Sequence, residues 1–348
     1  MLPSMKTLFA AMLVSVAQPP EATISPDRLM EALRALPPER SVLRTPDEQD
    51  TLKQTEELLI ARLRAIGLEP TEQTLEWSTG GMARVWSEDG WKFVPDPTPR
   101  SWRNIYVEFP GAVSPNEVII VGAHFDSHPN TPGADDNASG VAAALEMARA
   151  LKDTSTARTI RIVFFNLEEI GLVGSREHAA WMQQRIEQGQ EHIVGMLSLE
   201  MIGYYADEPN SQRSPIPAIP GVFTPPTVGD FLGVVANQSS AAFARQLVSS
   251  MRQAEPALKV ELLDFIPGAG EMFPDVRRSD HSPFWDIGAP AVMVTDTSEF
   301  RTPHYHQPSD TPDTIDVERF TLATRALTGA VWRLARPVVR LDESNEDR

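Results

Sequence analysis

Short apolar runs in the middle of the chain are each followed directly by side chains that bind metal ions. The run 118–121 is followed by His124 and Asp126, and a second run ends just before Glu168 and Glu169. The chain has no cysteine, which excludes thiolate nucleophiles and thiolate metal sites. Imidazole and carboxylate are the remaining strong ligands, so these positions predict a metal site built from His, Asp and Glu.

The spacing within each group indicates what the side chains do. His124 and Asp126 are two residues apart, so both point to one face of an extended strand, where the carboxylate of Asp126 can orient the imidazole from outside the ligand shell. Adjacent carboxylates at the end of a buried strand are unfavourable without a neutralising cation. The pair Glu168 and Glu169 therefore predicts one metal ligand and one general base.

Three further segments supply the same residue types. The turn-forming sequence 133–140 contains Asp135 and Asp136 and leads into an alanine-rich helix, where a rigidly held carboxylate can bridge two cations. Glu200 ends another apolar run, and His306 follows the last one. Taken singly, each of these features is more typical of an ordinary turn, core or surface. Their recurrence at successive strand ends favours a single metal centre.

The elements that must position these side chains alternate between strands and helices. The expected strands and helices are the segments 118–121, 140–151, 160–165, 178–186, 194–199 and 289–295. This alternation predicts an α/β fold with a mostly parallel central sheet and helices on both faces. Open sheets of this kind bind ligands at the carboxyl ends of their strands, which is where the metal-binding residue types occur.

The rest of the chain fits one domain. Helices are expected at 45–66 and 317–335, short strands and loops at 67–103, and a proline-rich loop at 206–229, with residues 104–335 as the catalytic core of a single domain 18–348. Residues 1–17 have the outline of a signal peptide, with an apolar stretch from Leu8 to Ala17, and predict a periplasmic or secreted protein. That stretch is too short to span a bilayer, and a lipid anchor would need a cysteine, so no stable membrane anchor is expected.

The net charge of −17 argues against nucleic acid as a partner, because binding phosphates requires an excess of Lys and Arg. The sequence leaves the oligomeric state open.

Several blocks of the sequence resemble the M28 metallopeptidases, which include bacterial aminopeptidases. The matching blocks are GAHFDS at 122–127, GADDNASGV at 133–141, FFNLEEIGLVGS at 164–175, LSLEMIGY at 197–204, SDHSPF at 279–284 and PHYHQPSDT at 303–311. The resemblance covers residues 104–335. It is specific, because the order of the blocks and their spacing both agree.

The resemblance assigns a role to each candidate. It implies that His124 and Glu200 hold one metal, that Glu169 and His306 hold the other, and that Asp136 bridges the two. It further implies that Glu168 is the general base and that Asp126 supports His124. The chain departs from the usual pattern at Glu200, where the resembling aminopeptidases most often have Asp.

The resemblance implies a metallo-exopeptidase that uses two Zn²⁺ ions, with Mn²⁺ or Co²⁺ as substitutes, to remove N-terminal residues from peptide substrates. Two enzymatic alternatives stay open. One is a carboxypeptidase or dipeptidase of the same family, and the other is a glutaminyl cyclase with a single zinc. A binding module without activity is disfavoured, because all five ligand positions carry ligand residues.

Overall fold

The computed structural model describes residues 18–43, 50–78, 80–87, 89–95 and 101–335. Residues 1–17, on which the signal-peptide prediction falls, lie outside this part. The helices are α1 (Pro26–Ala35), α2 (Asp50–Ala65), α3 (Gly140–Leu151), α4 (Val173–Glu187), α5 (Ala241–Ala254), α6 (Ser282–Asp286) and α7 (Val317–Leu334). The strands are β1 (Thr71–Leu75), β2 (Met82–Ser87), β3 (Gly90–Pro95), β4 (Trp102–Phe109), β5 (Ser114–His124), β6 (Arg158–Phe165), β7 (His192–Glu200), β8 (Leu232–Asn237), β9 (Val260–Ile266) and β10 (Ala291–Thr295).

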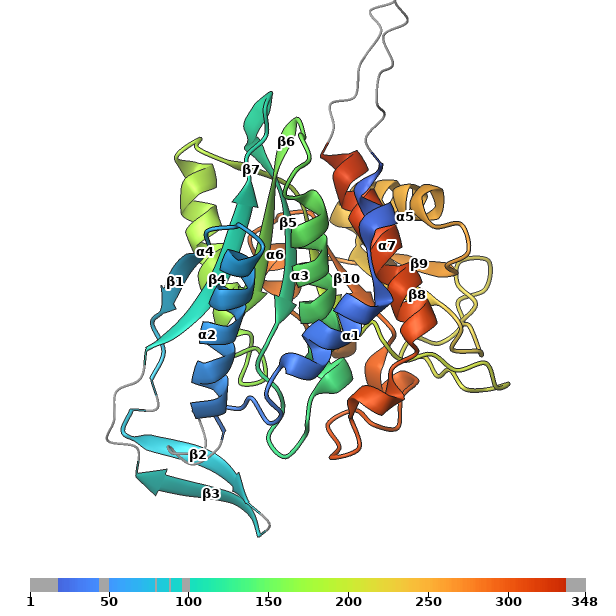
Figure 1. The fold of residues 1–348 in the computed structure, drawn as a ribbon. Coiled ribbons are helices and arrows are strands. Elements are labelled where there is room, and N and C mark those ends of the chain that lie inside the picture. Colours follow the sequence, from blue (N-terminus) through green and yellow to red (C-terminus); the bar gives the residue numbers. More distant parts are fainter. Residues whose placement is uncertain (1–17, 44–49, 79, 88, 96–100, 336–348) are drawn as a thin grey trace, which may run out of the picture.

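A central sheet of eight described strands has the order β1-β4-β6-β5-β7-β10-β8-β9 (Figure 1). Its middle is parallel: β5 pairs with β6 and β7, and β7 pairs with β10. The flanks are mixed, since β4 runs antiparallel to β6 and β8 runs antiparallel to β10. The predicted α/β class with a mostly parallel sheet is therefore confirmed. The separate hairpin of β2 and β3 projects at the lower left of Figure 1.

Helices cover both faces of the sheet, as the sequence predicted. Alternate residues of β5 belong to different cores: Ile119 and Val121 pack with side chains of α1, α2, α3, α5 and α7, whereas Val118 and Ile120 pack with side chains of α4 and α6. This division follows from the two-residue repeat of a strand. A strand buried on both faces is apolar at most positions, which explains why β5 was recognisable as a continuous apolar run.

The main differences from the sequence prediction lie at the far edge of the sheet. The sequence prediction contained neither β8 and β9 nor the helix α5 between them. The strand β9 forms the edge and only its two end residues are buried, so its sequence lacks the continuous apolar run of the central strands. The predicted helix 140–151 coincides with α3, and the predicted start of α2 falls at residues 44–49, outside the described part.

Candidate metal centre

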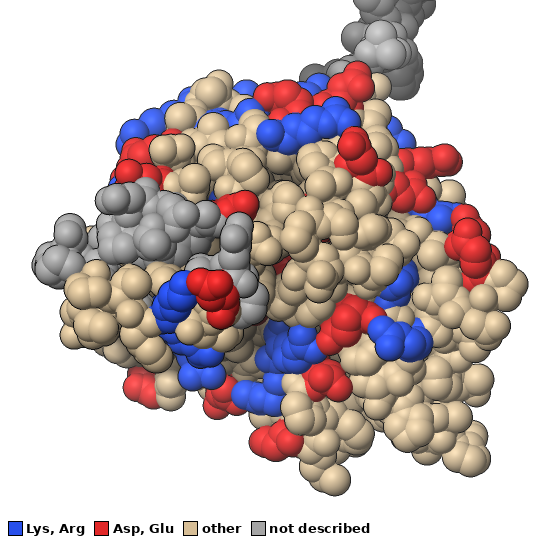
Figure 2. Space-filling view, turned by 90° about the horizontal axis from the view of Figure 1, so that it is seen from below, with Lys and Arg blue, Asp and Glu red and all other residues tan. Residues whose placement is uncertain are grey.

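The candidate residues meet at the carboxyl ends of the parallel strands, and β5 runs toward the lower end of the molecule in Figure 1. His124 is the last residue of β5 and Glu200 the last residue of β7. Glu168 and Glu169 follow β6 directly. Figure 2 looks onto this end, and in its described part Lys and Arg are interspersed with Asp and Glu over a largely uncharged face.

Two groups of ligand atoms lie within this end. One group contains His124, Glu168 and Glu200, and the other contains Asp136, Glu169 and His306; in each group the ligand atoms lie within 4.8 Å of one another. All six side chains come from loops or strand ends of the central sheet or from the C-terminal loop. The structure thus brings together every candidate ligand and the candidate base.

Asp136 connects the two groups. Its Oδ1 lies 3.4 Å from Nε2 of His124, and its Oδ2 lies 3.2 Å from Nε2 of His306. Nε2 of His124 is also 3.6 Å from Oε2 of Glu200, and Nε2 of His306 is 3.4 Å from Oε2 of Glu169. The two oxygens of one carboxylate therefore face two different imidazoles.

These spacings fit a metal centre. Zinc bonds of about 2.0–2.1 Å at tetrahedral angles separate neighbouring ligand atoms by about 3.3 Å, close to the four distances above. In addition, Oε1 of Glu169 is buried and has no hydrogen-bond partner among the described residues. A buried oxygen without a partner is unfavourable, and a cation would satisfy it. Imidazole nitrogens and carboxylate oxygens are also the donors that zinc accepts.

The electrostatics of the site favour a positive charge at its centre. Burial raises the pKa of Glu168 well above the usual carboxyl range, and burial together with the charge of Asp136 raises the pKa of Glu169 to about 7. Burial alone would lower the pKa of His306, but Asp136 and Glu169 outweigh it and raise that pKa to about 10. Several carboxylates crowded in a small volume thus stabilise cationic partners.

Asp126 contacts more of the site than the sequence indicated. Its backbone carbonyl forms a hydrogen bond of 3.1 Å with Nδ1 of His124, and its Oδ1 lies 3.5 Å from the same nitrogen, which is compatible with the predicted supporting role. The same carboxylate also accepts hydrogen bonds from the backbone amides of Glu168 (3.0 Å) and Glu169 (3.1 Å). Asp126 therefore links the imidazole at the end of β5 to the backbone of the two glutamates after β6.

Two further supporting residues were not predicted from the sequence. Asp310 accepts hydrogen bonds from the amides of Asp135 (2.8 Å) and Asp136 (3.2 Å), which links the loop of His306 to that of Asp136. Ser279 donates a hydrogen bond of 2.7 Å to Oε2 of Glu200. Both residues fall in sequence blocks that the resemblance singled out, so the blocks carried the only signal for them.

The match to a family model now decides the family. The model described as "Peptidase family M28" matches residues 104–331, which is more than half of the chain. The chain belongs to peptidase family M28. It is a metallopeptidase, and its substrates are peptides.

Several known proteins are similar to this M28 peptidase in sequence or in fold. The uncharacterized protein YfbL of Escherichia coli is 34% identical over 252 residues, which cover 68% of this chain and 71% of YfbL. Aminopeptidase YwaD of Bacillus subtilis is 26% identical over 235 residues, covering 67% of this chain but only 44% of YwaD. The structure of BSAP, a zinc aminopeptidase from Bacillus subtilis, has the same fold, with a TM-score of 0.65 at 18% identity; the match covers 90% of this chain and 96% of BSAP.

The other histidines of this M28 peptidase differ in their relation to the site. His281 is buried, forms a hydrogen bond of 2.9 Å with the carbonyl of Val276 and packs edge-on against Trp285, so its role is in packing. His128 stacks on the ring of His306 with centroids 4.1 Å apart. It therefore borders the site.

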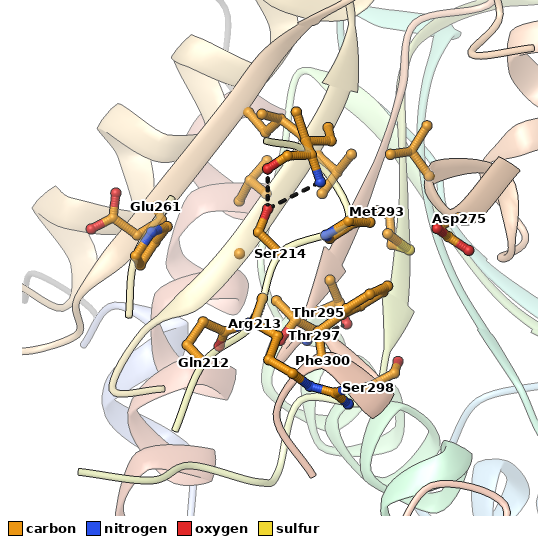
Figure 3. A pocket seen from close by; sticks show the side chains of 18 of the residues that line it. Gln212, Arg213, Ser214, Glu261, Asp275, Met293, Thr295, Thr297, Ser298 and Phe300 are labelled. Carbon is orange, nitrogen blue, oxygen red and sulfur yellow. Dashed lines mark hydrogen bonds between the residues drawn. The ribbon is translucent and has the colours of Figure 1, made fainter. Parts of the chain in front are cut away.

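A pocket opens beside the metal centre of the M28 peptidase (Figure 3). Glu200 forms part of its wall, and the proline-rich loop covers it with Ile216 and Phe223. The opposite wall comes from β8, β9 and β10 and includes Met293. The root of the loop is fixed, because Nε2 of Gln212 donates a hydrogen bond of 2.8 Å to Oγ1 of Thr297.

No described helix is both long and apolar enough to cross a membrane.

Proposed function

We propose that the enzyme is an aminopeptidase with a co-catalytic site for two metal ions. In this proposal His124 and Glu200 hold one ion, Glu169 and His306 hold the other, and Asp136 bridges them. The observation that carries the proposal is the placement of Asp136, whose two oxygens face one imidazole each at 3.4 and 3.2 Å. Zinc is the expected metal, with Mn²⁺ or Co²⁺ as substitutes.

The residues around the ligands support hydrolysis. When bound, the two cations polarise the scissile carbonyl and lower the pKa of the attacking water. Glu168 lies on the side of His124 and Glu200, and its backbone is fixed by Asp126. We assign to its carboxylate the transfer of a proton from the attacking water to the leaving amine. The raised pKa of Glu168 agrees with a group that accepts a proton and then releases it.

The pocket supports an exopeptidase that reads the first residue of a peptide. It is mainly apolar, and its cavity of about 140 Å³ is close to the roughly 150 Å³ that hold a benzene-sized group. Because Glu200 borders both the pocket and the metal centre, a side chain in the pocket belongs to the residue beside the scissile bond. We therefore expect a preference for N-terminal Leu, Met or Phe.

The decisive experiment combines metal content with substrate choice. Zinc per chain is measured on the purified protein, and hydrolysis is followed with free-amine and N-acetylated aminoacyl amides, with and without a chelator. We expect about two zinc ions and chelator-sensitive cleavage of the free-amine substrates only. One zinc ion without hydrolysis would instead indicate a glutaminyl cyclase, and cleavage of the N-acetylated substrates would indicate a different kind of peptidase.

We also propose that the enzyme is exported, on the basis of the signal-like sequence of residues 1–17. Fractionation of expressing cells followed by N-terminal sequencing tests this. Export predicts an extracytoplasmic protein that begins near Gln18, whereas an intact N-terminus on a cytoplasmic protein would contradict it.

A further inference from the structure

A buried arginine from the N-terminal part of the chain holds the loop that leads to Asp136. Arg40 is 1% exposed. Its Nε donates to the carbonyl of Phe125 (2.7 Å), and its Nη2 donates to the carbonyl of Gly133 (2.8 Å). Its Nη1 donates to the carbonyls of Pro37 (2.8 Å) and Pro132 (2.9 Å). One guanidinium therefore joins both ends of the loop 125–133.

These contacts are unusual for a buried arginine. Buried charges are generally paired with an opposite charge, whereas every hydrogen bond described for this guanidinium goes to a backbone carbonyl. The rigid planar fork of arginine suits this task, because it presents several donors in fixed directions. The backbone of Arg40 takes part as well, since its carbonyl accepts a hydrogen bond of 2.9 Å from the amide of Ser127.

The loop is held from its other side by Asp310, which accepts from the amides of Asp135 and Asp136. Arg40 thus donates hydrogen bonds to backbone carbonyls just before Asp136 in the sequence. Asp310 accepts hydrogen bonds from the backbone amides of Asp135 and of Asp136 itself. Between them they leave the backbone at Asp136 little freedom to move. Both contacts therefore act on the backbone that carries the carboxylate of Asp136.

Arg40 also adds a fixed positive charge behind the carboxylate cluster. Burial lowers the pKa of the guanidinium, and the nearby carboxylates of Asp310, Asp126, Asp136 and Glu169 oppose this by stabilising its charge. By the same interaction the guanidinium favours the ionised carboxylates, which are the forms that bind a metal. Yet residue 40 lies before the region 104–331 that matches the family model.

We propose that Arg40 is a positioning residue of the metal centre and that the N-terminal segment carrying it belongs to the catalytic unit. The proposal rests on the two-metal function proposed above. Arg40 does not touch the substrate. It acts through the loop 125–133, by fixing the place from which Asp136 reaches both ions.

The test compares three variants. Arg40→Met keeps the approximate length of the side chain and removes its charge and donors, whereas Arg40→Lys keeps the charge and removes the fork. The control is Arg161→Met: Arg161 is also 1% exposed but pairs with Glu108 and Glu191. For each protein we would measure zinc stoichiometry, zinc affinity by chelator competition, kcat and KM, and the melting temperature in excess chelator.

We expect Arg40→Met to lower the affinity for the weaker zinc by about 10–100-fold, as does loss of other residues that support metal ligands. At limiting zinc kcat falls in parallel, while KM changes little because the substrate pocket is intact. Arg161→Met lowers the melting temperature and leaves zinc affinity unchanged. Wild-type zinc affinity and kcat in a folded Arg40→Met protein would overturn the proposal.

If Arg40→Met does not fold, Arg40→Lys decides. A lysine ammonium cannot reach the carbonyls of Phe125 and Gly133 in the same geometry, so we expect at least about a 10-fold loss of zinc affinity. Unchanged affinity in Arg40→Lys would then overturn the proposal. A wild-type protein that binds no zinc, with activity insensitive to chelators, would contradict the proposed function instead.

Discussion

At the residue scale, two neighbouring glutamates belong to different halves of the metal site. Glu168 lies with His124, and Glu169 lies with His306, although the two glutamates are adjacent in sequence. Asp126 binds both of their backbone amides, so the direction of each side chain is set by one common support. This arrangement lets adjacent carboxylates take different roles, which substitutions can separate.

We expect Glu168→Gln to retain two metals and the wild-type melting temperature while kcat falls by about 10²–10⁴-fold, since only the proton acceptor is removed. Glu169→Gln is the matched comparison and should lose metal instead, because it removes a proposed ligand. Metal analysis and steady-state kinetics on both variants measure this contrast. Near-native turnover in Glu168→Gln would show that another group is the base.

Asp136→Asn addresses the bridge itself. An amide carries no negative charge and offers one oxygen in place of two, so it cannot serve both imidazole-bearing halves. We expect the metal content to fall from two per chain to at most one and kcat to fall at least about 100-fold. Asp153→Asn, at a side chain that is 87% exposed, is the control. An Asp136→Asn protein with two tightly held metals would rule out the bridging role.

At the element scale, the sequence was informative where burial is complete. The strands β5, β6 and β7 are mostly apolar along their inner length, so both they and the metal-binding residues after them could be predicted. The edge strand β9 could not, because exposure relaxes the pattern.

The hydrogen bonds that support the metal ligands could not be predicted from the sequence either, because they join segments that are far apart in the chain. Asp310 and Asp135 are 175 residues apart, and Arg40 and Gly133 are 93 residues apart. Only the folded chain brings them together.

The proline-rich loop gives the next prediction. Ile216 is 1% exposed and lines the pocket, whereas Val222 on the same loop is 63% exposed. We expect Ile216→Trp to fill the pocket and lower kcat/KM for leucyl amides at least about 10-fold, with a smaller effect on alanyl amides. Val222→Trp should leave both values unchanged. Equal losses on the two substrates in Ile216→Trp would mean that the pocket does not hold the first side chain.

At the scale of the whole molecule, acid stability depends on buried groups outside the metal centre. His281 is fully buried, and burial, together with the nearby charge of Arg277, lowers its pKa to about 3. In the unfolded chain the histidine pKa is about 6.5. Between about pH 3 and 6.5 the unfolded chain therefore binds a proton at His281 that the folded protein does not bind. His281 therefore contributes stability that is fully present above pH 6.5 and is lost as the pH falls towards 3.

The size of this effect is measurable. Lowering the pH from 7.5 to 5 should reduce the free energy of unfolding of the wild type by about 2 kcal/mol relative to His281→Phe, which cannot titrate. The lost hydrogen bond to Val276 is a constant offset in that variant and does not depend on pH. Urea unfolding of both proteins is compared at each pH in excess chelator, so that release of metal by acid does not contribute. Parallel pH profiles would mean that His281 becomes protonated within the folded protein, which would require the core around Trp285 to admit a charge.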